Sequence, residues 1–181
     1  AANGPASIFE RSVGLNNSVV VDGATDKGFF KIGDTNTDDK RIMPNSQIKK
    51  NLVNFSAAYD VTSKVQVFSA VNYTSTDGLG RYGTGYDSKN LMTNFRQWWQ
   101  VNVDVQEQRE AYERKKQNVT WNWTDPTILA PIYWDNAYWT RYENYQNDHR
   151  DRYFGYAGLT YKVTNWFDVT GRVAIDQYDE L

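Results

Sequence analysis

Residues 150–172 read Arg150-Asp151-Arg152-Tyr153-Phe154-Gly155-Tyr156-Ala157-Gly158-Leu159-Thr160-Tyr161-Lys162-Val163-Thr164-Asn165-Trp166-Phe167-Asp168-Val169-Thr170-Gly171-Arg172, and their pattern is the clearest structural signal in the chain. Up to Val163, one parity carries mainly apolar and aromatic side chains, and the other carries polar ones such as Lys162. A period of two is typical of a β-strand with one apolar face. Thr164 and Asn165 interrupt the pattern, which resumes at Phe167, so the stretch predicts a tight antiparallel hairpin.

The same unit occurs earlier in the chain. In residues 52–61, one parity is apolar throughout, namely Val53, Phe55, Ala57, Tyr59 and Val61, and the other carries Asn54, Ser56, Ala58 and Asp60. After Thr62 and Ser63 the alternation resumes with Val65 and Val67. Two shorter strands are expected upstream, joined by a turn-type cluster at residues 25–28. We therefore predict an all-β fold of six antiparallel strands, at about residues 17–24, 28–34, 47–61, 64–74, 150–163 and 166–177.

The connections between these strands alternate between short and long. Tight turns join the strands within each hairpin, whereas residues 35–46 and 75–149 form long connections that strand parity places on one side. Short turns on one side and long loops on the other are typical of outer-membrane barrels. Tyr153 and Tyr161 would lie about 20 Å apart along the membrane normal, close to the height of an apolar band between aromatic girdles. Six strands cannot close a barrel, so we expect a section of a larger transmembrane β-barrel.

A soluble β-sandwich is the alternative, because its strands also alternate. Sandwich strands are usually shorter than these, with turn signals every 8 to 12 residues, which favours the barrel. In a barrel, one parity of each strand would contact lipid. The expected lipid-facing residues are Val53, Phe55, Tyr59, Val65, Val67, Tyr153, Leu159, Tyr161, Phe167, Val169 and Val173.

The 75–149 connection is the candidate functional region, read as an extracellular loop. It contains six of the seven Trp residues, and aromatic segments bury enough surface to fold. Asp87 or Ser88 would cap a helix from Lys89 to about Gln117. Exposed Trp and Tyr side chains suit sugar faces or peptide side chains; the alternative is that the Trp residues form the loop's own small core. The candidates for ligand or lid contact are Trp98, Trp99, Trp121, Trp123, Tyr133, Trp134, Tyr138 and Trp139.

Composition excludes several classes of protein. The 181 residues carry a formal charge of −2, which argues against nucleic-acid binding, and no Cys, which excludes disulfides and thiolate metal sites. No apolar run is long enough for a membrane-spanning helix. The first ten residues lack the pattern of a secretory leader.

Short motifs give no enzyme assignment. The segment Gly78–Gly83 matches a dinucleotide fingerprint, but no βαβ unit follows, so a flexible extracellular loop is expected there. Asp34–Asp38 resembles half of a calcium loop but lacks the required Gly and Glu, which leaves at most a weak calcium site within Asp34–Asp39. His149, the only histidine, has no nucleophile motif nearby. We predict no catalytic residue, no metal site and no cofactor.

Several of these segments together resemble the SusC/RagA family of TonB-linked outer-membrane receptors of Bacteroidota. The hairpin at 150–172 resembles the barrel hairpins of that family, and Tyr133–Trp139 resembles its Asn-Pro-Tyr-Trp element, with Ala137 in place of Pro. Segments 42–46, 95–100 and 118–122 are also similar. The similarity runs from about Asn16 to Tyr178.

The resemblance implies a 22-stranded plugged barrel in the outer membrane of a Gram-negative bacterium. Such a barrel would import glycan or peptide nutrients without covalent chemistry. Its partners would be TonB, a SusD-like surface lipoprotein that acts as a lid, and outer-membrane lipid. The plug domain and most strands are missing from the sequence, so residues 1–181 are expected to be one barrel section. The alternative is a soluble secreted β-domain that binds carbohydrate through exposed aromatics.

Overall fold

The computed structural model describes residues 1–81 and 83–181, which form two compact units. The sheet unit contains residues 14–38, 48–77 and 148–181, and the loop unit contains residues 1–13, 39–47 and 78–147. Both long connections belong to the loop unit, together with the N-terminal segment.

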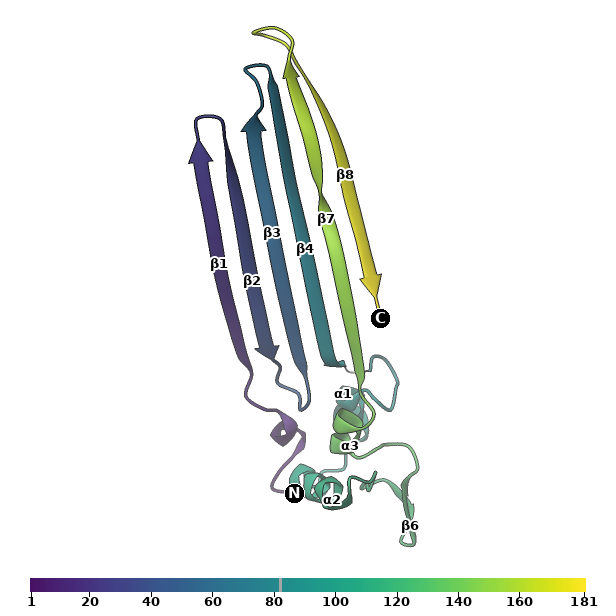
Figure 1. Cartoon of the computed structure of the whole chain (residues 1–181). Coiled ribbons are helices and arrows are strands. Elements are labelled where there is room, and N and C mark those ends of the chain that lie inside the picture. The colour runs from purple at the N-terminus through teal and green to yellow at the C-terminus, as the bar shows by residue number, and fades with distance from the viewer. Residues whose placement is uncertain (82) are drawn as a thin grey trace. The chain divides into compact units, whose positions relative to one another are not determined.

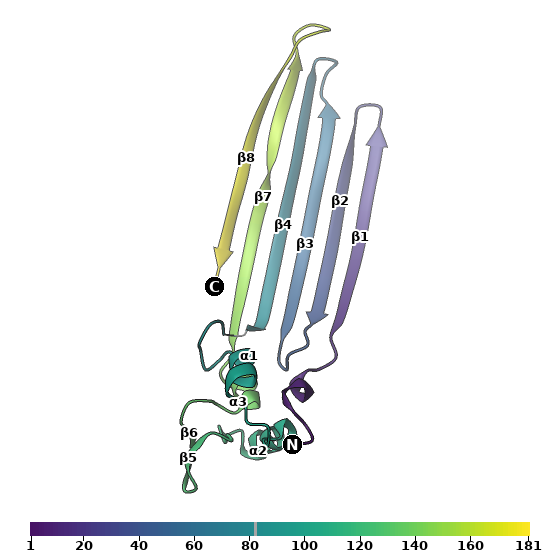
Figure 2. The ribbon, with the colours of Figure 1, turned by 180° about the vertical axis from the view of Figure 1, so that it is seen from behind.

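Six long strands form one antiparallel sheet, as the alternation predicts. Their order in the sheet equals their order in the chain, so every strand pairs with its sequence neighbours, and β1 and β8 are the edges (Figure 1). The reverse view in Figure 2 shows the same single row of strands. The strands are β1 (Val13–Thr25), β2 (Gly28–Lys40), β3 (Gln47–Asp60), β4 (Val65–Arg81), β7 (Gln146–Lys162) and β8 (Asp168–Glu180).

Several strands are longer than the sequence predicts. β1 begins at Val13, β2 continues to Lys40 and β4 continues to Arg81. The additional residues are largely polar, so they add no hydrophobic alternation, but their side chains pair across strands. Thr37, for example, donates a 2.6 Å hydrogen bond to Asn16. Consequently Asp34–Asp39 lies in strand β2 rather than in a calcium-binding loop, and residues 78–81 belong to β4 rather than to a flexible loop; Tyr82 lies outside the described residues.

The register of β7 and β8 sorts their side chains between two faces. Ala157 pairs with Val173 and Tyr161 with Val169, whereas Arg152 and Asp176 share the other face, where their side chains form a two-bond ion pair. We call these the apolar face and the polar face. Successive side chains of a strand point to opposite faces, so each assignment extends along its strand.

Side-chain contacts carry the two faces into the other strands. Tyr73 of β4 stacks on Tyr153 at 4.7 Å between ring centroids, which places it on the apolar face. Gln66 of β4 donates a hydrogen bond to Asp60 of β3, which places both on the polar face. By strand alternation, the predicted lipid-facing residues of the four strands share the apolar face, namely Val53, Phe55, Tyr59, Val65, Val67, Tyr153, Leu159, Tyr161, Val169 and Val173. Phe167 immediately precedes β8, and its carbonyl accepts a backbone hydrogen bond from Val163.

The sheet unit has no hydrophobic core. Its only buried residue is Gly33, and large apolar side chains such as Val169, Val173 and Ile175 are exposed, Val173 by 77%. A soluble sheet normally buries one face against another layer. All six strands lie in one sheet, so they do not form the two packed sheets of a sandwich.

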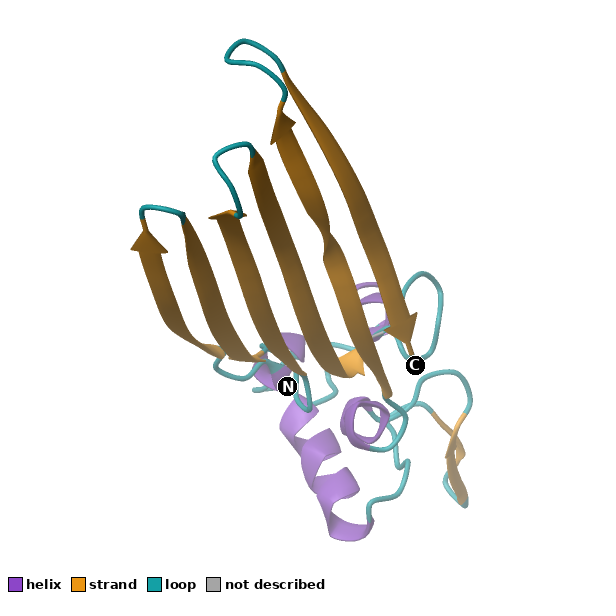
Figure 3. Ribbon diagram, turned by 45° about the horizontal axis from the view of Figure 1, so that its top comes forward, coloured by secondary structure: helices purple, strands orange, loops and turns teal. Residues whose placement is uncertain are grey.

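The loop unit contains short helices and a small hairpin (Figure 3). A 3₁₀ turn at Pro5–Ile8 precedes α1 (Leu91–Thr93), a π-helical turn (Asn94–Trp98), α2 (Val105–Lys115) and α3 (Ala137–Tyr142). Strands β5 (Trp123–Asp125) and β6 (Ile128–Pro131) form the hairpin. None of the helices among residues 1–81 and 83–181 is long and apolar enough to span a membrane.

The prediction of one helix from Lys89 to Gln117 is wrong. Asn90, rather than Asp87 or Ser88, caps α1 by accepting hydrogen bonds from the backbone of Met92 and Thr93. The chain then leaves the helical conformation at Trp99, and Asp104 caps a new helix. The break lets α2 and Trp99 both contact one hydrophobic core, which is built from Ile8, Met43, Leu91, Val105, Tyr112, Ala137 and Tyr138.

Candidate functional site

The aromatic residues predicted to contact a ligand fall into three groups. Trp98, Trp123 and Tyr133 are exposed, Tyr133 by 74%. Trp99, Trp121 and Trp139 are partly buried, and Trp99 and Trp139 pack against the core. Trp134 and Tyr138 are only 6% and 4% exposed, so they are structural residues of the loop unit and are not available at its surface.

An exposed aromatic cluster forms around Trp98. Its ring stacks with that of Trp134 at 6.4 Å between centroids, and Tyr86 approaches both rings edge-on, at 6.2 Å and 6.1 Å. Tyr86 is 73% exposed and Trp98 is 46% exposed, while the buried Trp134 packs against both rings. We call Tyr86, Trp98 and Trp134 the aromatic platform. Tyr86 lies in a glycine-rich stretch without periodicity, so the sequence pattern gives no sign of its role.

Polar groups hold Trp134, the buried member of the aromatic platform, in place. The backbone N–H of Trp134 donates to the side-chain oxygen of Asn122, and its carbonyl accepts a hydrogen bond from the Thr120 hydroxyl. Two residues later, fully buried Asn136 caps α3 and donates to the carbonyls of Gln108 and Val119. The platform is therefore built on a rigid base, because every polar atom of the Asn136 side chain is used.

A buried arginine links three segments of the loop unit. Arg141 is 1% exposed and donates to the backbone carbonyls of Pro44, Asn45 and Gly80. The side-chain amide of Asn45 donates in return to the Arg141 carbonyl at 2.8 Å. Burial lowers the pKa of the Arg141 guanidinium, and the three carbonyl oxygens replace the water it has lost.

Two buried tyrosines of the loop unit, Tyr112 and Tyr138, have perturbed pKa values. Burial, together with a 2.7 Å hydrogen bond to Glu143, raises the pKa of the Tyr112 phenol. Burial likewise raises the pKa of Tyr138. Both phenols therefore stay protonated at neutral pH and act as hydrogen-bonding core residues. The described part of the chain contains no group of three or more His, Asp or Glu residues arranged to hold a metal ion.

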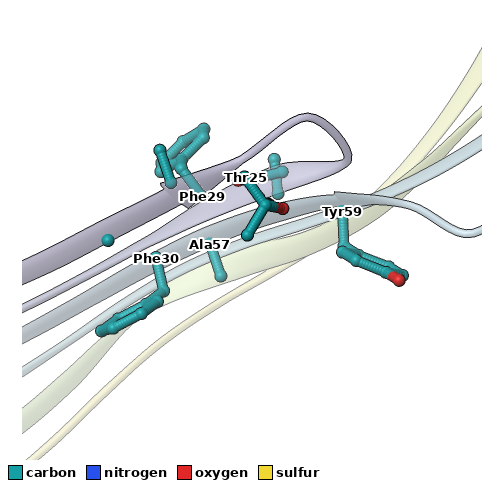
Figure 4. A pocket seen from close by; sticks show the side chains of 9 residues that line it. Thr25, Phe29, Phe30, Ala57 and Tyr59 are labelled. Carbon is teal, nitrogen blue, oxygen red and sulfur yellow. Dashed lines mark hydrogen bonds between the residues drawn. The ribbon is translucent and has the colours of Figure 1, made fainter.

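The apolar face of the sheet unit is the second candidate surface. A hollow of about 450 Å³ lies between strands β1, β2 and β3. In Figure 4, Phe30, Ala57 and Tyr59 point to one side of the sheet and Phe29 to the other. The small residues Gly23, Gly28 and Ala57 leave the hollow between the rings of Phe30 and Tyr59. Its mainly apolar lining suits a hydrocarbon chain better than a polar solute.

His149 lies near one end of the apolar face. Its two ring nitrogens contact Asp77 and Asp151, at 2.7 Å and 3.1 Å, and Tyr73 donates a hydrogen bond to the other oxygen of Asp151. Each ring nitrogen of His149 thus contacts a carboxylate oxygen and not a hydroxyl group. This cluster is therefore not a catalytic triad, whose histidine bonds a nucleophile on one side.

Comparison with known proteins provides no family for this chain. No family model matches the sequence, and no curated protein sequence matches it.

Proposed function

We propose that the six-stranded sheet is a section of the wall of a large outer-membrane β-barrel. The observation that carries this proposal is the sheet unit itself, which exposes one continuous apolar face and buries only Gly33. Large exposed apolar surfaces mark sites of protein–protein or membrane interaction. Lipid would cover the apolar face, and the polar face would line the lumen.

The distribution of tyrosines supports this orientation. Tyr73 and Tyr153 stack near one end of the apolar face, and Tyr59 and Tyr161 lie beside the short turns at the other end. Eight residues separate Tyr153 from Tyr161, which corresponds to about 20 Å along the normal of a tilted strand. Beyond Tyr153 the same face becomes charged, with Asp151 and His149. The face thus has a band of apolar side chains between two levels of tyrosine, with charged residues beyond one of them. This arrangement is the one expected of a surface that contacts a membrane.

We further propose that the barrel is a TonB-dependent receptor of the SusC/RagA kind, which imports glycan or peptide nutrients by binding and gated passage. This part of the proposal rests on the resemblance of the hairpins and of segment 133–139. The aromatic platform would contact the substrate or a SusD-like lid. A soluble carbohydrate-binding domain would also use such a platform, but it would need a cover for the apolar face.

Single-cysteine labelling tests the barrel proposal directly, because the chain has no Cys of its own. Val169→Cys on the apolar face and Thr170→Cys on the polar face form a matched pair of adjacent residues. With a spin label in bilayers, oxygen should relax the Val169 label strongly, and a water-soluble nickel reagent should relax the Thr170 label. Protection of the Val169 label from oxygen, in a protein that stays monodisperse without detergent, would sink the proposal.

A further inference from the structure

The polar face carries an arginine whose guanidinium group contacts two aromatic rings. The guanidinium of Arg172 in β8 lies 4.5 Å from the ring centroid of Tyr156 in β7 and 5.6 Å from that of Phe68 in β4. The two rings contact each other edge-on at 6.1 Å. Cation–π contact of this kind fixes the plane of the guanidinium.

A glycine makes room for this arrangement. Gly158 pairs directly with Arg172, and a Cβ at this position would overlap with the Phe68 ring. The absence of a side chain lets Phe68 lie across the neighbouring strand beneath the guanidinium. Thr160 and Thr170 lie next along the polar face, with their hydroxyls 2.9 Å apart. Arg172 of β8 is thus held by residues of two other strands, β4 and β7.

The other two arginines of β7 and β8 have both a ring and a carboxylate. Arg152 lies over Phe154 and pairs with Asp176, while Arg150 lies over Tyr178 and pairs with Glu180. Arg172 has two rings, but no carboxylate lies within ion-pair distance of it among residues 1–81 and 83–181. Its guanidinium carbon lies over the Tyr156 ring, and no ion pair within the described residues uses its N–H groups, so these groups can bind an anion.

We infer that Arg172, on its support of Phe68 and Tyr156, binds the carboxylate group of an acidic solute that moves along the polar face. This inference rests on the proposed function, in which the polar face lines the lumen. A planar guanidinium forms two parallel hydrogen bonds with a carboxylate, the arrangement that Arg152 already makes with Asp176. The carboxylate could belong to a uronic acid or to a peptide, since both present the same group.

Nuclear magnetic resonance of the full chain in detergent micelles tests this site. Glucuronate and N-acetylglycinate should each shift the Nε–Hε signal of Arg172 in a saturable way, whereas glucose and N-acetylglycinamide should not. If only one of the two acids shifts the signal, the result shows whether the bound carboxylate belongs to a uronic acid or to a peptide. If neither acid moves the signal more than its neutral counterpart, the inference is wrong.

Variants separate binding from folding. Arg172→Gln should weaken acid binding about tenfold or more, and Arg172→Lys should weaken it too, because lysine keeps the charge but loses the planar fork. Arg150→Gln removes an arginine that is already paired and should leave binding unchanged. Circular dichroism would show that each variant keeps its strand content. Oxygen access at Val169 reports on the barrel independently, so either proposal can fail while the other stands.

Discussion

Arg141 and Gly80 are joined by a 2.6 Å hydrogen bond from the buried guanidinium to the glycine carbonyl. Gly80 has a φ of 68°, and a Cβ there would overlap with the carbonyl of Asn45. Asn45 itself has a φ of 51°. The two unusual backbone conformations bring carbonyl groups to one guanidinium, and so the end of β4, residues 44–45 and α3 are held together.

Substitution of Gly80 should therefore destabilise the loop unit strongly. We expect Gly80→Ala to lower the free energy of unfolding by about 3 kcal/mol, because a left-handed backbone and a steric overlap combine. Gly85→Ala is the matched control, since Gly85 has a φ of 66° with open space around it and should cost only about 1 kcal/mol. Urea unfolding followed by tryptophan fluorescence measures both variants. Equal losses would show that the contact with Asn45 contributes nothing.

Arg141→Lys tests the guanidinium itself. Lysine keeps the charge but cannot reach three carbonyls with fixed geometry, so buried carbonyls lose their partners. We expect a loss of about 3 kcal/mol in the free energy of unfolding. Arg114→Lys on the exposed surface of α2 should change stability by less than about 0.5 kcal/mol. A tolerated Arg141→Lys would mean that charge alone suffices at this position.

Acid should weaken the loop unit through Asp104. Partial burial raises the pKa of Asp104, but hydrogen bonds from Asn3 and from the backbone of Gln106 outweigh it and lower the pKa. A carboxyl group whose pKa is lowered by folding stabilises the folded state above its unfolded pKa, about 3.9, and loses that effect as pH falls through the folded value. The thermal midpoint should therefore fall below about pH 4.

Asp104→Asn is the control for this acid response. Asparagine still caps α2, but it does not titrate, so the midpoint of the variant should fall less steeply over the same pH range. Calorimetric scans from pH 6 to pH 2 compare the two proteins. Parallel curves would assign the acid sensitivity to other carboxylates.

The two faces of β8 should respond oppositely to a charge. Val173→Lys places an ammonium on the apolar face opposite Ala157, midway between the levels of Tyr153 and Tyr161. In a bilayer it should cost about 2–4 kcal/mol, whereas Ala174→Lys on the polar face should cost less than about 1 kcal/mol. Folding from urea into phosphatidylcholine vesicles measures both values. Similar costs for the two variants would argue against lipid contact at Val173.

The aromatic residues of the loop unit should also separate by role. Tyr138→Ala removes a core side chain and should lower the free energy of unfolding by about 3–5 kcal/mol. Trp98→Ala removes an exposed ring and should cost about 1 kcal/mol. Urea unfolding of the purified variants measures this difference. A large loss for Trp98→Ala would make the aromatic platform a structural feature rather than an available surface.

The sheet could be predicted because each strand carries its own signal. Parity in β3 and β7 identifies the apolar face, and the tight turns identify the hairpins. The strand ends were missed because polar residues such as Asn16 and Thr37 continue the ladder without hydrophobic alternation. Sequence alone also does not reveal the order of strands, which follows from pairing across distant segments.

The loop unit was harder to predict because contacts distant in sequence decide it. The break before α2 had a local signal, since Asp104 followed by Glu107 at the third helical position is a capping pattern. The burial of Trp134 and Tyr138 had none, because it depends on α2, on residues 118–122 and on the N-terminal segment. Tyr86 contacts Trp98 only after the segment between them has folded back on itself, and no local pattern indicates that contact.

The unbroken pairing of β7 with β8 also restricts how the length of this protein can vary in evolution. One residue added inside either strand would turn every later side chain to the opposite face, bringing Arg152 or Asp176 to the apolar side. Two added residues would restore the alternation. Length changes within the strands are therefore expected in pairs, whereas the turn at residues 163–167 is free of this restriction.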